Sequence, residues 1–177
     1  MDIEKLKYPI GKFQKPVEFT DEKISEFINV LETLPRNIKL QVTNLTEDQL
    51  DTQYRPNGWT IRQVVNHIAD SHMNSLIRFK LALTEKNPTI KPYFEDRWAE
   101  LIDSKNIPIN SAVKMIEGIH ERWVVLLKSF TQNDWERTFY HPESKREISL
   151  KENLAIYAWH SLHHLAHITE LKKRNSW

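Results

Sequence analysis

The stretch Gly58-Trp59-Thr60-Ile61-Arg62-Gln63-Val64-Val65-Asn66-His67-Ile68-Ala69-Asp70 carries the clearest helix start in the chain. Thr60 and Gln63 have the spacing of a capping box, in which the threonine hydroxyl and the glutamine side chain each bind a backbone N–H of the first turn. Trp59 precedes this box as half of a hydrophobic staple. The pattern predicts a long helix from Ile61 to about Leu83.

Further helix starts lie on both sides of this stretch. Thr20 stands before two acidic residues and predicts a helix over residues 21–34. Pro35 is expected to end that helix, because proline lacks the N–H that a helix needs. Ser149 and Glu152 repeat the capping-box spacing before the last helix. The other expected helical segments are 38–45, a short segment from Thr46 to about Tyr54, a long helix from about 110 to 130, and 150–173.

The connections between these helices complete the fold prediction. Residues 87–106 contain two prolines and are expected to form a long crossover with one helical turn around 94–102. Two short alternating runs, Thr138–His141 and Arg146–Ile148, leave a small β-hairpin open as an alternative to a loop. Four substantial helices are buried most economically as a bundle. We therefore expect an all-α four-helix bundle, with a long crossover, that forms a single domain over residues 1–177.

Composition excludes several classes of function. The chain has 25 Lys and Arg against 24 Asp and Glu, a net charge of +1, which disfavours a nucleic-acid partner. It contains no cysteine, so disulfides, thiolate metal sites and a cysteine nucleophile are absent. No stretch approaches the roughly 20 apolar residues of a membrane span, and the N-terminal sequence has no secretory pattern. We expect a cytoplasmic protein without a membrane partner.

Histidines in the last predicted helix are the most informative residues for function. Four of the eight histidines lie there: His160, His163, His164 and His167. Residues four apart share one stripe of a helix, so either the pair His160 and His164 or the pair His163 and His167 can approach one ion. A helical wheel places His164 roughly 45° and His160 about 85° from the centre of the apolar arc. The first pair therefore faces the bundle better.

A metal site in a bundle needs at least one ligand from another helix. The candidates are His67, His72 and His120. Periodicity places His72 on the apolar side of its helix and His67 on the polar side. By this criterion His72 is a core residue and His67 a surface residue, although a ligand at the margin of the apolar stripe remains compatible with a catalytic ion.

Two of these segments together carry a family resemblance. Gly58–Asp70 and His160-Ser161-Leu162-His163-His164 resemble the two histidine motifs of the DinB-like superfamily of four-helix bundles, most closely its YfiT group. The resemblance implies metal ligands at His67, His160 and His164, and a metal-dependent hydrolase. Related members transfer low-molecular-weight thiols such as bacillithiol, so a thiol S-transferase is the alternative reaction. His72, His120, His163 and His167 have no place in this pattern.

Three neutral imidazoles would leave an open coordination position on one divalent metal per subunit. Zinc is the first expectation and nickel an alternative, because imidazole suits both ions. Zinc lowers the pKa of bound water to about 7 and would ionise a small thiol in the same way. The expected partner is a small-molecule substrate, with or without a thiol. We assign no catalytic acid or base, although Asp70 lies one turn after His67 and is a candidate proton carrier or a solvated carboxylate.

Other readings of the sequence stay open or fail. His120-Glu121 begins like the zincin motif, but Val124 stands where the second histidine is required. The stretch Pro92-Tyr93-Phe94, together with Trp98, is a candidate pocket wall. A non-catalytic bundle that binds a partner or an adventitious metal is the alternative to an enzyme. The richness in tryptophan favours a homodimer.

Overall fold

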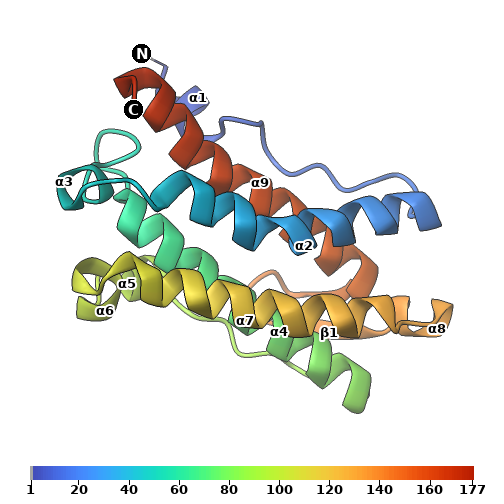
Figure 1. Ribbon diagram of the computed structural model, residues 1–177. Helices are drawn as coiled ribbons and strands as arrows, with labels where there is room; N and C mark the ends of the chain where they lie inside the picture. The colour runs from blue at the N-terminus through green and yellow to red at the C-terminus, as the bar shows by residue number, and fades with distance from the viewer. Residues whose placement is uncertain (1) are drawn as a thin grey trace.

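The computed structural model describes residues 2–177, in which four long helices form a bundle (Figure 1). They are α2 (Asp21–Val42), α4 (Ile61–Thr84), α7 (Ile109–Lys128) and α9 (Leu150–Asn175). The short elements are α1 (Ile3–Lys7), α3 (Glu47–Leu50), α5 (Glu95–Trp98), α6 (Ile102–Asn106), α8 (Gln132–Trp135), β1 (Thr138–His141) and β2 (Arg146–Ser149). The predicted all-α bundle is confirmed. No helix in residues 2–177 is both long enough and apolar enough to span a membrane.

Helices that follow one another in the chain are not always neighbours in the bundle. α2 packs against α7 and α9, and α4 packs against the same two helices, so α2 and α4 lie on one diagonal and α7 and α9 on the other. α4 and α7 are parallel neighbours (Figure 1). A parallel pair needs a connection that returns along the whole helix, which explains the long crossover between them. Its short helices α5 and α6 pack on α4.

Two apolar layers fill the bundle on either side of a polar belt. One layer includes Phe79 and Trp123, and the other includes Ile38 and Ile61. On α7 the buried residue between the layers is His120, which is 1% exposed. The corresponding parts of α4 and α9 also carry buried polar residues: Ser71, His72, Ser75, Ser161, His163, His164 and His167. The middle of the bundle is therefore a belt of histidines and serines rather than a continuous apolar core.

The prediction that Pro35 ends a helix is wrong. α2 continues through Pro35 to Val42, so the segments predicted as two helices form one. Leu34 and Ile38 on either side are almost completely buried, and their packing stabilises the helix across the proline. Proline cannot donate to the carbonyl oxygen of Leu31 four residues earlier. That oxygen instead accepts a hydrogen bond of 2.6 Å from Nδ1 of His120.

The hairpin and most helix starts agree with the sequence patterns. β1 and β2 pair antiparallel with Thr138 opposite Ser149, so the hairpin alternative is confirmed. The capping box of Thr60 with Gln63 is complete. At Ser149 only the serine half is formed, since the carboxylate of Glu152 instead binds Lys15 at 2.7 Å and Arg146 at 2.6 Å.

Candidate metal centre

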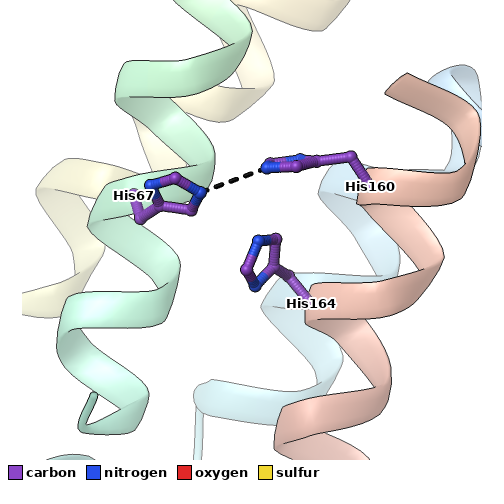
Figure 2. A group of neighbouring side chains, drawn as sticks. All are labelled: His67, His160 and His164. Carbon is purple, nitrogen blue, oxygen red and sulfur yellow. Dashed lines mark hydrogen bonds between the residues drawn. The ribbon is translucent and has the colours of Figure 1, made fainter. Parts of the chain in front are cut away.

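Three histidine rings from two helices converge on one space between α4 and α9 (Figure 2). Nε2 of His67 lies 3.1 Å from Nε2 of His160, and His164 completes the group one turn further along α9. One ring nitrogen from each of the three lies within 4.8 Å of the others. The structure thus brings together the three residues that the family resemblance implies.

The periodicity argument that placed His67 on the surface is wrong, since this residue is only 8% exposed. A helical wheel assumes that one side of a helix faces solvent. α4 is covered by α7 and α9 and also by α3, α5, α6 and β1, so its polar side is buried as well. The ring of Trp59 lies 4.7 Å from the ring of His67 and forms part of this cover.

Burial keeps these rings neutral at physiological pH. Burial lowers the pKa of His67 to about 4, with His163 as a second cause. Burial, followed by neighbouring histidines, also lowers the pKa values of His160 and His164 well below the ordinary value for histidine. A neutral imidazole has one unprotonated ring nitrogen, so each of the three rings can offer a lone pair to a cation. This donor set fits a divalent cation such as zinc or nickel.

The cluster opens into a cavity of about 600 Å³. Aromatic side chains form much of its wall: Tyr8, Tyr54, Trp59, Tyr93, Tyr157 and Trp159. The predicted wall is confirmed for Pro92 and Tyr93, but Phe94 is 65% exposed and does not line the cavity. Trp98 packs against Tyr93 with the ring centroids 4.6 Å apart. The candidate cation site therefore faces a space large enough for a small organic molecule.

Charged side chains of both signs line this cavity, and the sequence patterns identified none of them. The cations are Lys7, Arg55 and Arg78, and the carboxylates are Glu95, Asp96 and Glu143. They come from segments far apart in the chain, so no spacing rule connects them. Only the three-dimensional arrangement brings these charges to the wall of one cavity.

Asp70, the candidate proton carrier, lies apart from this cavity. It is absent from the cavity wall, and the described residues show no hydrogen bond between it and His67. Burial and the nearby Asp103 raise the pKa of Asp70 to about 6. The structure does not support Asp70 as a partner of the histidine cluster.

The second histidine pair of α9 is also buried, contrary to its position on the helical wheel. His163, His164 and His167 form a second group whose nitrogens lie within 4.8 Å of one another. Nε2 of His167 donates to the backbone carbonyl of Lys7 at 3.0 Å, and the ring stacks on Tyr54. The segment that precedes α2 covers this side of α9, which sequence periodicity could not indicate.

His72 and His120 are core residues that contact each other, and His72 also contacts His160 of the histidine cluster. Nδ1 of His72 lies 2.8 Å from Nε2 of His120, and Nε2 of His72 lies 3.0 Å from Nδ1 of His160. Periodicity correctly placed His72 in the core. It gave no signal for these contacts, because they join α4, α7 and α9.

Comparison with known proteins finds a matching family model and relatives that share one name. Residues 31–168 match the family model of the DinB superfamily. Proteins of Oceanobacillus iheyensis and Bacillus cereus strain 03BB102 are 56% and 54% identical over 97% of this chain and 98% of their own, and each carries the name "Putative metal-dependent hydrolase".

One solved structure resembles the chain closely over nearly its whole length, and a more distant one shares only the fold. YfiT from Bacillus subtilis, described as "a probable metal-dependent hydrolase with an unusual four-helix bundle topology", is 48% identical with a TM-score of 0.95 and covers 98% of this chain and 99% of its own. A mycothiol-dependent maleylpyruvate isomerase is 14% identical with a TM-score of 0.65, over 82% of this chain and 60% of its own. At that identity the likeness shows a shared fold only.

Proposed function

This chain belongs to the DinB superfamily, and from this membership we propose that it is a metal-dependent hydrolase with one divalent cation held by His67, His160 and His164. Its close relatives carry the name of metal-dependent hydrolases, marked as putative. The observation that carries the proposal is the convergence of three neutral imidazoles at the wall of an open cavity. Three protein ligands with access for another molecule are typical of catalytic rather than structural sites.

We expect zinc first and nickel as the alternative, because imidazole nitrogens suit both ions. A bound cation would supply Lewis-acid chemistry, which polarises carbonyl oxygens and lowers the pKa of water and of thiols. The described cluster contains no carboxylate ligand, so the charge of the cation would stay uncompensated by its protein ligands.

The residues around the cluster bind and orient the substrate. The aromatic wall excludes water from one side of a bound molecule and offers faces for stacking. Lys7, Arg55 and Arg78 in the cavity wall favour substrates with an anionic group, while the three carboxylates of the wall favour a cationic group elsewhere on the same molecule. The substrate class that fits these walls is a small organic molecule that carries charge.

Thiol transfer is the second candidate reaction. The cavity of about 600 Å³ has room for a low-molecular-weight thiol beside an electrophile. The distant fold neighbour is described as mycothiol-dependent, which makes thiols a reasonable group of compounds to test. Since the chain has no cysteine, any reacting thiol has to come from a bound small molecule.

Metal analysis tests the proposal directly. We expect protein purified without chelators to contain one zinc or nickel per chain. His67→Ala, His160→Ala and His164→Ala should each lose most of this metal. His141→Ala is the matched control, because His141 lines the same cavity outside the histidine cluster. Wild-type protein without stoichiometric metal, or single variants at these three histidines that retain it, would contradict the proposal.

An activity screen separates the candidate reactions. The metal-loaded protein is tested with esters, with amides, and with electrophiles in the presence and absence of a small thiol. Turnover of an ester or amide without thiol supports the hydrolase, and turnover that requires thiol supports the transferase. Metal binding without any turnover that depends on the three histidines favours the non-catalytic alternative.

A further inference from the structure

A chain of hydrogen bonds leads from His160 across the middle of the bundle. Nδ1 of His160 contacts Nε2 of His72 at 3.0 Å, and Nδ1 of His72 contacts Nε2 of His120 at 2.8 Å. The last ring nitrogen, Nδ1 of His120, contacts the carbonyl oxygen of Leu31 at 2.6 Å. This first relay joins α9, α4, α7 and α2.

A shorter chain leads from His164 toward the N-terminal segment. Nδ1 of His164 lies 3.3 Å from Nδ1 of His167, and Nε2 of His167 contacts the carbonyl oxygen of Lys7 at 3.0 Å. This second relay joins α9 to α1. Both relays therefore start at a candidate metal ligand and end at a backbone carbonyl.

Neither carbonyl oxygen accepts a hydrogen bond within its own helix, so each can accept one from a histidine. Leu31 would receive the N–H of residue 35 in a regular helix, but residue 35 is Pro35. Lys7 is the last residue of α1, and the last carbonyls of a helix have no partner within it. Pro35 and the end of α1 thus leave two acceptors that the histidines fill.

The carbonyl ends fix the direction of every hydrogen bond. A carbonyl oxygen only accepts, so Nδ1 of His120 and Nε2 of His167 must carry protons. In a neutral ring the other nitrogen then accepts from the next histidine. Burial lowers the pKa of His120 to about 4, which keeps that ring neutral at pH 7. The same alternation of donor and acceptor nitrogens along both relays places a proton on Nδ1 of His160 and on Nδ1 of His164.

We propose that His72, His120 and His167 are positioning residues that hold His160 and His164 as Nδ1–H tautomers, so that the lone pair of each ligand that can bind the cation is on Nε2. The inference rests on the proposed metal centre. Metal-binding histidines commonly donate their other N–H to a carbonyl or carboxylate, which fixes the tautomer and the ring orientation. Here other histidines carry out this role and pass the constraint to the backbone.

Nitrogen-15 NMR of the histidine rings in the full-length, metal-free protein tests the inference. We expect the proton on Nδ1 in both His160 and His164. An Nε2–H tautomer at either residue in the wild type overturns the assignment for that relay. This measurement needs no variant, so it stands even where a substitution destabilises the fold.

Two variants test whether the relays act separately. His120→Phe removes the link to Leu31, so His72 can reverse its donor and the proton of His160 should shift toward Nε2. His164 should keep its tautomer. His167→Phe should have the opposite pattern, and each variant is thus the matched control of the other. Equal changes at both ligands in either variant would indicate a merely structural effect and contradict the inference.

Titration with zinc connects the tautomers to binding. We expect each variant to bind zinc 10- to 100-fold more weakly than the wild type, as is typical for the loss of an outer partner of a metal ligand. A wild type that has both Nδ1–H tautomers but binds no zinc refutes the metal centre and not the relays. A wild type that binds one zinc through Nε2–H rings in its free state refutes the relays. Two zinc ions per chain, with Nδ1 of His164 as a ligand, would also refute the second relay.

Discussion

Gly58 and Gly118 differ in what an added methyl group would meet. At Gly118, inside α7, a Cβ has no atom within 4 Å, whereas at Gly58 it would lie 2.6 Å from Cγ and 3.1 Å from the carbonyl oxygen of Arg55. We expect Gly118→Ala to stabilise the protein by about 1 kcal/mol, because alanine is the better helix former. Gly58→Ala should destabilise it by about 1–3 kcal/mol through overpacking. Urea unfolding of the metal-free protein measures both, and equal effects would contradict the contrast.

The lowered pKa of His120 predicts how the stability of the protein depends on pH. Burial lowers its pKa from 6.5 to about 4, an effect that the hydrogen bond to Leu31 only partly offsets. Above pH 6.5 both the folded and unfolded states are neutral at this residue. As the pH falls toward 4, the unfolded state binds the proton first, so the folded state loses stability. This residue alone should cost about 2 kcal/mol between pH 7 and pH 5.

Unfolding free energies of the metal-free protein at pH 7 and pH 5 check this expectation. His120→Phe should lose less stability than the wild type over the same interval, because it no longer has that titrating ring. The other buried histidines remain in both proteins, and the pKa of His72, which His120 also helps to lower, changes in the same favourable direction in the variant. A variant whose loss equals that of the wild type would contradict the assigned cause.

At the scale of elements, helix starts were predictable from the sequence, whereas the burial of some histidines was not. A capping box such as Thr60 with Gln63 depends on residues three apart, so the local sequence contains all the information. The burial of His67 and His163 depends on segments that arrive from distant parts of the chain. The prediction that a helix ends at Pro35 failed for the same reason. Tertiary packing and the ring of His120 compensate for the helical hydrogen bond that proline cannot make. The family resemblance indicated His67, the one member of the cluster that periodicity had placed on the surface.

The capping box at the start of α4 gives a prediction for that element. Thr60→Ala removes the hydroxyl that accepts from the N–H of Gln63, and should destabilise the protein by about 1 kcal/mol. Thr60→Ser keeps an oxygen at the same place and should behave nearly as the wild type. Urea unfolding distinguishes them, and a serine variant as unstable as the alanine variant would show that the methyl group matters instead.

At the scale of the whole molecule, the histidine belt occupies positions in the bundle where apolar side chains would pack. Rings of α4, α7 and α9 meet between two apolar layers, and the proposed ligands are drawn from α4 and α9. A continuous apolar core would be expected to stabilise the bundle more, since buried polar groups contribute little net free energy even when paired. The belt is understandable if a bound cation compensates by linking two helices.

A cation that binds only the folded chain must raise its stability. At a free zinc concentration 100-fold above the dissociation constant, the gain is about 2.7 kcal/mol. We expect the melting temperature to rise with zinc and to fall when a chelator removes it. The variant with alanine at His67, His160 and His164 should melt at one temperature in both conditions, while His141→Ala should follow the wild type. A zinc response that survives the triple substitution would place the cation elsewhere, with the remaining histidines of α9 as the first group to examine.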